Sequence, residues 1–500
     1  MSGERSSILR LHAEDNVGIA LVDLKPGQAG ASEAIPRGHK MALDAIPQGA
    51  FVRKYGQIIG VATVDIAAGA HVHTQNLGVG TERGGDAGTS EIQPIAPASV
   101  RDTFLGYRRP DGRVGTRNFI GILTTVNCSG SVAHFIAEEA ERSGLLADLE
   151  NVDGVVPIAH GSGCGMAGQG EGYETLMRTL AGYAQHPNFG AILLVGLGCE
   201  VMQLPVLAAK KELRDPSRFQ FLTIQNSGGT RKTVEAALPA LRKLAETANA
   251  TSREPVSAEH LVIGMQCGGS DGLSGITANP ALGIASDMVV AQGGTSILSE
   301  TSEIYGAEHL LTRRAKPEVA AALMERIAWW EDYCARNGGE MDNNPSPGNK
   351  RGGLTTILEK SLGAVAKGGS APLEAVYKYA EPIDRHGFVF MDSPGYDPCS
   401  VTGQVASGAN LIVFTTGRGS VSGYRPVPCI KIATNNDLWA RMGEDMDINC
   451  GDVIDGVPLA DKGAEIYRMM LDVASGRLTK SEAQGFGRVE FIPWQIGAVM

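Results

Sequence analysis

The chain of 500 residues lacks the features that define several large classes of protein. No stretch approaches the roughly 18 consecutive apolar residues that a membrane-spanning helix needs. Residues 1–10 contain no apolar signal core. We therefore expect a cytoplasmic protein of several domains without a membrane partner. The motifs of serine hydrolases, P-loop enzymes, thermolysin-like proteases and protein kinases are absent as well.

Cysteine pairs of the C-x-x-C type are also absent, which argues against a zinc ribbon or finger. A chain of this size without a signal peptide is not expected to depend on disulfides. Most of the eight cysteines should be small buried hydrophobes. Four differ, because each closes an apolar run and opens a glycine or polar turn. For these four, burial and proximity to a metal or substrate both stay open: Cys128, Cys164, Cys199 and Cys267.

Positive charge is in deficit, since 44 Lys and Arg residues stand against 55 Asp and Glu residues, a balance of −11. This acidity argues against nucleic acid and against an anionic membrane as partners. An anionic substrate would need positive groups concentrated in one cleft. Gly196-x-Gly198 lacks the rest of a dinucleotide fingerprint, so we do not expect nucleotide binding.

Glycine is abundant, with 65 residues that cluster in short loops after apolar runs. Residues 1–77 alternate short β-like runs with turns and predict a small β module. The module closes with His71 and His73, which an extended strand places on one side. The two could share a ligand, or they could be surface or packing residues. Residues 78–103 are rich in small residues and proline and predict a flexible linker. The expected strands of the module are 8–12, 16–21, 50–55 and 58–64.

Strands and helices alternate from residue 104 onward, which predicts a mainly parallel sheet covered by helices in a middle domain, 104–250. The functional loops of such a sheet collect at the carboxyl ends of its strands. Ser129 is expected to cap the helix that follows it, and His160 ends a strand beside a glycine loop. The expected strands are 119–126, 152–159, 191–195 and 219–224.

A second α/β domain is predicted for residues 251–500. Its most prominent loop, 264–280, joins an apolar strand to a helix and holds a thiol, a carboxylate, hydroxyls and several glycines. Residues 343–353 contain two prolines and several glycines, so we expect a shaped loop without regular secondary structure. Lys431 lies within an apolar strand and must be paired or functional, because burying a lone charge is costly.

These loops could hold a divalent metal with mixed ligands. Thiolate and imidazole favour iron or zinc, whereas carboxylate and carbonyl oxygens suit magnesium, calcium or manganese. Alternatives remain for each group: Asp271 could cap the next helix, and Glu300 could be an ion-pair partner. The candidate ligands are Cys164, Cys199, Glu200, Cys267, Asp271 and Glu300.

Several long strings resemble the altronate/galactarate dehydratase family, in the right order and over nearly the whole chain. They are GYRRPDGRVGTRN (106–118), GLGCE (196–200), GMQCGGSDGLSGITANP (264–280), NPSPGNK (344–350) and TTGRG (415–419), together with the module that ends in His71-Val72-His73. The resemblance implies an N-terminal β-clip module, a middle dimerisation domain and a C-terminal Rossmann-like domain with a parallel sheet. It also implies a homodimer and a dependence on Fe²⁺, with Mn²⁺ as a substitute.

The activity that the resemblance implies is dehydration of a sugar acid, D-altronate to 2-keto-3-deoxygluconate. The H-x-H pair looks more like altronate dehydratases, whereas Gly264-Met-Gln-Cys267 looks more like galactarate dehydratases, so galactarate remains an alternative substrate. A sulfo-lyase acting on sulfolactate is a further rival, although there the small module and the large portion are often separate chains. A sugar-acid-binding protein without turnover is the rival from another class.

Dehydration requires a base for the α-proton and an acid for the β-hydroxyl. His160 or Lys431 is predicted as the base, and Arg418 and Lys350 are predicted to hold the carboxylate. A di-acid would need further cations, for which Arg108, Arg109, Arg117 and Arg351 are candidates. The predicted site comprises catalytic His160, Lys431 and Lys350; substrate-binding His71, His73, Ser270, Asn279, Asn349 and Arg418; and metal ligands Cys267, Asp271, Glu300, Cys164 and Cys199.

Overall fold

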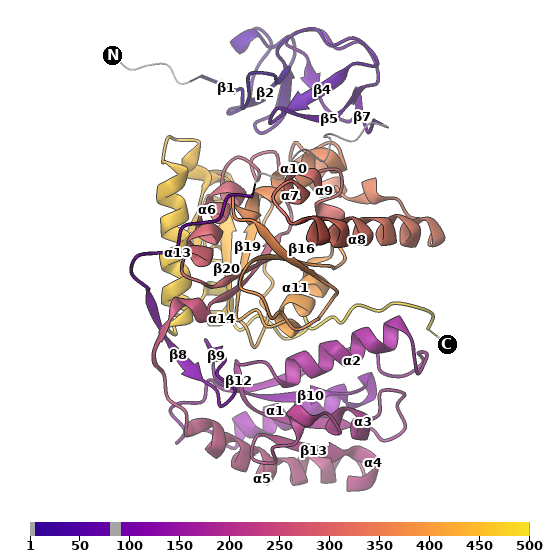
Figure 1. Ribbon diagram of the computed structural model, residues 1–500, viewed down its shortest axis with the longest axis vertical. Helices are drawn as coiled ribbons and strands as arrows, with labels where there is room; N and C mark the ends of the chain where they lie inside the picture. Colours follow the sequence, from indigo (N-terminus) through magenta and orange to yellow (C-terminus); the bar gives the residue numbers. More distant parts are fainter. Residues whose placement is uncertain (1–5, 81–91, 500) are drawn as a thin grey trace.

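The computed structural model describes residues 6–80 and 92–499, and part of the predicted linker, 81–91, lies outside the described residues. Three bodies are stacked along the long axis of the molecule (Figure 1). The last domain of the sequence lies in the centre, with the N-terminal module at one end and the middle domain at the other. A small strand-rich module followed by parallel sheets confirms the predicted α/β class.

The N-terminal module consists of two small antiparallel sheets, ordered β1-β2-β3-β6 and β4-β5-β7. Strands were expected where β1, β2, β4 and β5 lie, whereas no strand was expected at β3. The strand is hard to recognise from sequence because it begins with a charged residue, Lys40. Charged residues usually lie at the surface, whereas Lys40 is fully buried. The bounds are β1 (Ile8–Leu9), β2 (Val17–Ala20), β3 (Lys40–Ala42), β4 (Phe51–Lys54), β5 (Gln57–Ala62), β6 (His71–Val72) and β7 (Leu77–Gly78).

The middle domain has a four-stranded parallel sheet ordered β11-β10-β12-β13. Helices α1 and α5 pack on one face of it, and α2 packs on the other. Ser129 precedes α1 as predicted, but its hydroxyl donates to Val126 O and caps no helical N–H. The bounds are β10 (Phe119–Thr124), α1 (Gly130–Arg142), β11 (Gly154–Ile158), α2 (Glu171–Ala184), β12 (Phe189–Gly196), α3 (Leu204–Ala208), β13 (Phe219–Thr223), α4 (Ile224–Ser227) and α5 (Thr230–Asn249).

A small antiparallel sheet, β14-β8-β9, joins the middle and C-terminal domains. The chain enters the middle domain from β8 (Thr103–Arg108) and β9 (Val114–Gly115) and leaves it through β14 (Glu254–Ser257). Near the end of the chain, the carbonyl of Ile496 approaches α2 so closely that a Cβ on Gly172 would lie 2.1 Å from it. The C-terminal tail therefore runs between the two domains (Figure 1).

The C-terminal domain is built on a seven-stranded sheet ordered β17-β18-β16-β15-β19-β20-β21, and all of its strand pairs are parallel. From β15 the chain continues to β16 on one side, and from β19 it continues to β20 and β21 on the other. The β15/β19 pair is therefore a topological switch point. The bounds are β15 (Val262–Cys267), β16 (Thr295–Ser299), β17 (Leu373–Tyr377), β18 (Gly387–Met391), β19 (Leu411–Thr416), β20 (Cys429–Ala433) and β21 (Ile448–Asn449).

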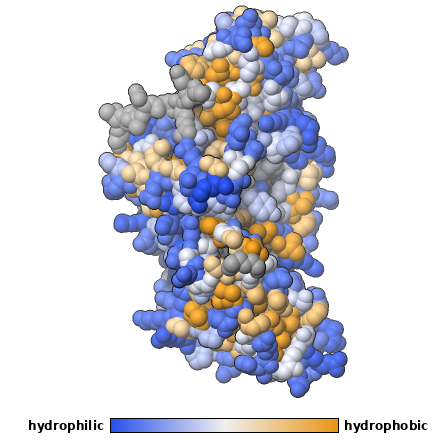
Figure 2. All heavy atoms as spheres, turned by 90° about the vertical axis from the view of Figure 1, so that its right-hand side faces the viewer, coloured by the Kyte–Doolittle hydropathy of each residue, from blue (hydrophilic) through white to orange (hydrophobic). Residues whose placement is uncertain are grey.

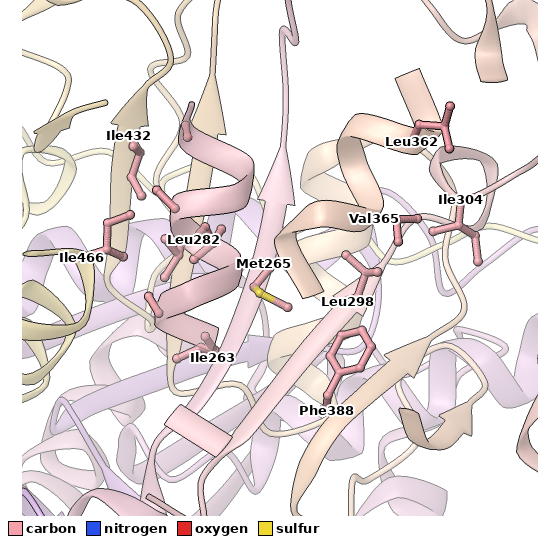
Figure 3. Close-up of a cluster of buried hydrophobic side chains, with 14 of the residues drawn as sticks. Ile263, Met265, Leu282, Leu298, Ile304, Leu362, Val365, Phe388, Ile432 and Ile466 are labelled. Carbon is pink, nitrogen blue, oxygen red and sulfur yellow. The ribbon is translucent and has the colours of Figure 1, made fainter. Parts of the chain in front are cut away.

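Helices α6, α10 and α13 cover one face of this sheet. Leu282 of α6, Val365 of α10 and Ile466 of α13 are part of one core with Met265 and Leu298 of the sheet (Figure 3). On the opposite face, α11 packs against α2 of the middle domain. The helices are α6 (Ala278–Ala291), α7 (His309–Thr312), α8 (Pro317–Arg336), α9 (Pro347–Arg351), α10 (Ile357–Val365), α11 (Asp397–Ala406), α12 (Asn436–Met442), α13 (Leu459–Ala474) and α14 (Lys480–Ala483).

The prediction that residues 343–353 contain no regular structure was wrong, because α9 lies within them. Ser346 caps this helix, and its hydroxyl accepts from the N–H of Asn349, whose side chain in turn caps the Ser346 backbone. Pro347 occupies the first turn, where its missing N–H costs no helical hydrogen bond. The proline thus starts the helix.

No helix among residues 6–80 and 92–499 combines the length and the apolar character needed to cross a bilayer. On the face drawn in Figure 2, small apolar patches lie among larger hydrophilic areas.

Candidate functional site

The N-terminal module docks where the loops of the C-terminal switch point end. Gly272, in the loop after β15, approaches Gly38 so closely that a Cβ on it would lie 2.1 Å from the Gly38 carbonyl oxygen. Gly353, just beyond α9, comes equally near, and a Cβ there would lie 2.5 Å from the same oxygen. Any larger side chain at either position would push the module away. The interface therefore requires these glycines.

Three histidines of the module meet at this interface. The pairing of β3 with β6 sets Met41 opposite His71 and Lys40 opposite Val72, so His39 lies at the same sheet position as His73. One possible ligand atom from each ring lies within 4.8 Å of the others. His39 Nδ1 is 3.0 Å from His71 Nε2, and His39 Nε2 is 3.3 Å from the carbonyl oxygen of Arg351. Among the described residues, it is the one group of three or more His, Cys, Asp or Glu side chains that converges in this way.

The electrostatics of the three-histidine group favour neutral rings. Burial, the neighbouring imidazoles and Lys40 lower the pKa of His39 and of His73 to about 4. Burial and Lys40 also lower the pKa of His71. Neutral imidazole is the form that binds a metal. His73 Nδ1 is buried without a hydrogen-bond partner, and the contact of His39 with a backbone carbonyl is the kind that orients a metal-binding ring. The group fits a transition-metal ion such as iron or zinc.

A buried ion-pair cluster fixes the module beside the histidines. Lys40, next to His39, donates to both carboxylate oxygens of Glu359 in α10 and to the carbonyl of Gly353. Lys54 donates to the same carboxylate at 2.9 Å, and Thr355 supplies two more donors. Burial alone would raise the pKa of Glu359, but the two lysines hold it far below its usual value. We call Lys40, Lys54, Thr355 and Glu359 the locking cluster.

A second buried charge cluster lies at the carboxyl ends of β15, β16 and β18. It contains three carboxylates and two ammonium groups: Glu300, Glu303, Asp397, Lys360 and Lys367. We call it the acid–base cluster. Lys360 Nζ donates to Glu303 and to Asn344, whereas Lys367 Nζ lies 3.8 Å from Glu303 without a hydrogen bond. Glu300 Oε2, Glu303 Oε2 and Asp397 Oδ1 are also buried without a hydrogen-bond partner.

The carboxyl groups of the acid–base cluster differ in their protonation. Burial, Glu303 and Asp397 raise the pKa of Glu300 well above its usual value. Burial would also raise that of Glu303, but Lys360 and Lys367 lower it. Burial and Glu303 raise the pKa of Asp397 to about 6. Glu300 also holds a left-handed backbone conformation, φ 70°, which is strained for a residue with a Cβ. Opposed pKa shifts in one crevice are typical of proton-transfer sites.

The loop after β15 connects the two features. A Cβ on Gly268 would lie 2.5 Å from Asp397 Oδ2, while Gly272, four residues on, contacts Gly38 beside the histidines. Adjacent residues of α10 make the same connection, since Glu359 belongs to the locking cluster and Lys360 to the acid–base cluster. The loop after β15 and helix α10 therefore connect the histidines with the acid–base cluster at the switch point, where an open α/β sheet usually forms its ligand-binding crevice.

The predicted substrate-binding residues Ser270, Asn279 and Asn349 shape the loops. Ser270 Oγ contacts Cys267 Sγ, and the Ser270 carbonyl accepts from Asn349. Asn279 bonds to the carbonyl of Gly363 and to Thr415. All three are at least 96% buried, and their contacts join the three glycine loops that the sequence singled out.

Asp271 and Cys267 are also engaged within the protein. Asp271 accepts from Ser274, the N–H of Leu273, Thr434 and Asn435. Its carboxylate therefore ties the loop to β20 and retains little capacity for a metal. Cys267 is buried between Ser270 and Asn279.

The proposed base candidates His160 and Lys431 are occupied elsewhere. His160 is buried in the middle domain, where Nδ1 accepts from Ser162 N and Nε2 contacts the carbonyl of Thr124. Burial lowers its pKa to about 4. Lys431 lies midway along β20, donates to the carbonyl of Ser422 and stacks over Phe486. Neither residue joins the crevice, so the structure does not support either as the base.

The five predicted metal ligands do not converge on one ion. Cys164 and Cys199 are exposed in the middle domain, whereas Cys267, Asp271 and Glu300 are buried in the C-terminal domain. Among the described residues, the side chains that converge closely enough to share an ion are His39, His71 and His73. Of the predicted residues, His71 and His73 belong to the histidine group and Glu300 to the acid–base cluster. Lys350, half-buried in α9, and Arg418, exposed after β19, flank the same loops.

Sequence reasoning missed His39, Asp397, Glu303, Lys360 and Lys367. His39 lies 32 residues from His71, and only the pairing of β3 with β6 brings them together. A signal existed for Asp397, because it begins α11 directly after the loop that follows the apolar strand β18. Lys360 and Lys367 lie in and just after an apolar helix and carried no such signal.

Comparison with known families covers nearly the whole chain. Residues 6–79 match the altronate/galactarate dehydratase SAF domain, residues 106–249 match the second domain of D-galactarate dehydratase/altronate hydrolase, and residues 258–499 match the C-terminal domain of D-galactarate/altronate dehydratase.

Individual relatives agree with these matches. The chain is 36% identical to the altronate dehydratase of Escherichia coli (strain K12), over 96% of this chain and 97% of that protein. It is 35% identical to the altronate dehydratase of Bacillus subtilis (strain 168), over 96% and 97%. The galactarate dehydratase (L-threo-forming) of Escherichia coli (strain K12) is 37% identical, over 94% and 93%. The chain therefore belongs to the altronate/galactarate dehydratase family of hydro-lyases.

Proposed function

We propose that the protein is a metal-dependent dehydratase that converts D-altronate to 2-keto-3-deoxygluconate. The observation that carries this proposal is the placement of three converging imidazoles over the crevice that contains the acid–base cluster. His39, His71 and His73 would hold the metal, which the family resemblance suggests is Fe²⁺ or Mn²⁺. When bound, the metal would supply Lewis-acid stabilisation of the negative charge that develops on substrate oxygens.

Proton transfer would be the task of the acid–base cluster. Asp397 is half-buried and faces Gly268, and its raised pKa lies near the pH at which a base works best. It would remove the α-proton of the sugar acid. Glu300, whose raised pKa keeps it protonated, would donate a proton to the leaving β-hydroxyl. Lys360 and Lys367 would keep Glu303 ionised, so that the two acids stay distinct.

A mono-acid substrate is supported by the positions of the four arginines that were candidates to bind a second carboxylate. A di-acid such as galactarate would need a second positive group in the crevice, and three of the four candidates are engaged far from it. Arg108 pairs with Glu254, Arg109 with the carbonyl of Pro187, and Arg117 with Glu482. The fourth, Arg351, remains at the crevice with Lys350 and Arg418, and this set would hold one carboxylate.

Anaerobic incubation with Fe²⁺ and a panel of aldonates and aldarates tests the proposal. We expect keto-acid formation from D-altronate in preference to galactarate. Preference for galactarate would overturn the assignment of D-altronate as the substrate. Release of sulfite from sulfolactate would favour a sulfo-lyase. No turnover of any panel member would refute the proposed dehydratase activity.

Loss of the metal site provides the second test. The variant His71→Ala/His73→Ala should lose turnover together with the iron bound at the histidines, measured by keto-acid assay and by elemental analysis against the wild type. Full activity in this variant would show that the three histidines do not hold the catalytic metal. The homodimer that the resemblance implies stays a prediction, which analytical ultracentrifugation can check.

A further inference from the structure

Three cysteines stand at one edge of the middle sheet. Cys128, Cys164 and Cys199 each follow one of the adjacent parallel strands β10, β11 and β12. In the register of β10 and β12, Thr124 lies opposite Val195. Cys128 and Cys199 are each four residues beyond this pair, so they occupy equivalent positions. Leu123 lies opposite Ile158, which places Cys164 at the same edge.

These three thiols are exposed, whereas Cys267, Cys399, Cys429 and Cys450 are buried and Cys334 is half-buried. Free cysteine is among the most buried residue types in proteins, because it packs as a small hydrophobe. Exposure is thus confined to the three cysteines that share a sheet edge. Packing does not explain them.

Direct contacts hold the three cysteine loops together. The N–H of Asn127, next to Cys128, donates to the carbonyl of Ser162, and its side chain donates to that of His160. The carbonyl of Gly163, next to Cys164, accepts from the N–H of Met202 in the third loop. A Cβ on Gly163 would lie 2.2 Å from the carbonyl oxygen of Thr125, and φ is +96° there. Only glycine allows this close approach.

The loop of Cys199 is supported from beneath. Glu200 is 3% exposed, and its carboxylate accepts from Thr125 Oγ1 at 2.7 Å and from the N–H of Gly198 at 2.6 Å. The side chain of Gln225 donates to Cys199 Sγ at 3.5 Å. Hydrogen bonds to ligand sulfurs are one of the means by which proteins tune bound metal centres.

We propose that Cys128, Cys164 and Cys199 hold an iron–sulfur cluster at the carboxyl edge of the middle sheet, separate from the three histidines. Three thiolates would bind a cubane cluster and leave one iron without a protein ligand. The three sulfurs do not all lie within 4.8 Å of one another, which disfavours a single ion, and the contacts between their loops would hold them around a larger, multi-iron centre. Soft thiolate ligands select such clusters.

The experiment is anaerobic reconstitution of the full chain with ferrous iron and inorganic sulfide, followed by iron and acid-labile sulfide analysis and electron paramagnetic resonance after reduction. We expect about four sulfides per chain, and about four irons in addition to the iron that the three histidines would hold. The variants Cys128→Ser, Cys164→Ser and Cys199→Ser should each lose most of the sulfide. Because all three side chains are exposed, the fold of the apo-protein should be unchanged by circular dichroism.

Cys334→Ser is the matched control, since Cys334 is a free cysteine in α8 of the C-terminal domain, and it should retain the full sulfide content. His71→Ala/His73→Ala should also retain the sulfide, which separates this inference from the proposed function. Absence of sulfide from the reconstituted wild type, or an unchanged sulfide content in the three cysteine variants, would overturn the inference.

Discussion

Two neighbouring residues of α10, Glu359 and Lys360, belong to buried charge clusters that differ in how completely their polar atoms are paired. In the locking cluster, the Glu359 carboxylate meets two ammonium groups, a hydroxyl and a backbone N–H. In the acid–base cluster, one ammonium nitrogen and three carboxylate oxygens have no hydrogen-bond partner. Both clusters are removed from water, so burial by itself does not separate them.

The difference indicates two tasks. Complete pairing repays the desolvation of buried charges and makes the contact specific to one docking geometry. Incomplete pairing costs stability, as does the left-handed backbone of Glu300, and such costs persist where a ligand or a reaction uses the unpaired groups. We therefore expect the locking cluster to set the position of the three histidines and the acid–base cluster to carry out proton transfer.

The substitution Glu359→Gln should produce the largest loss of stability. It leaves Lys40 and Lys54 buried without a counter-charge, a change that costs about 3–5 kcal/mol of the free energy of unfolding. Urea denaturation followed by circular dichroism measures this cost. The control is Glu254→Gln, whose partner Arg108 is 45% exposed, and an exposed pair is worth about 0–1 kcal/mol. Equal losses in both variants would show that burial does not distinguish the pairs.

Asp397→Asn should show the opposite behaviour. Removal of a general base lowers kcat about 10²–10⁴-fold, measured by keto-acid formation from the accepted sugar acid. Stability at pH 7 should stay equal or rise, because a carboxyl group whose pKa is raised in the folded protein opposes folding when ionised. The control is Asp384→Asn, an exposed carboxylate beyond the opposite edge of the sheet, which should leave kcat unchanged. A kcat for Asp397→Asn within threefold of wild type would exclude Asp397 as the base.

The pH dependence should give the smallest effect. Asp397 must be ionised to act as a base, and its pKa is raised to about 6. The value of kcat/KM should therefore fall about tenfold per pH unit below 6 and level off above it. The titratable groups that interact with Asp397 are Glu300, Glu303, Lys360, Lys367, Tyr424 and Cys429. A pH profile without this fall in kcat/KM would contradict Asp397 as the base. The same fall in Asp397→Asn would show that another group titrates.

The sequence by itself determined the main architecture. Buried parallel strands appear as continuous apolar runs, and the loops at the carboxyl ends of several of them are marked by glycine, so β10, β11, β12 and β15 could be placed from local pattern. The same local logic brought Cys128, Cys164 and Cys199 to strand ends. Composition is misleading at residues 343–353. Proline disfavours the interior of a helix, but Pro347 starts α9.

Only the tertiary structure decided which side chains form the site. His39 joins His71 through strand pairing, and Lys40 meets Glu359 from 319 residues away. Charged residues such as Lys360 and Lys367 are predicted as surface groups by composition, because an isolated charge is too costly to bury. Their burial becomes favourable only when distant carboxylates are brought opposite them. Local pattern specifies the strands and loops, whereas the pairing of charges depends on how the three bodies dock.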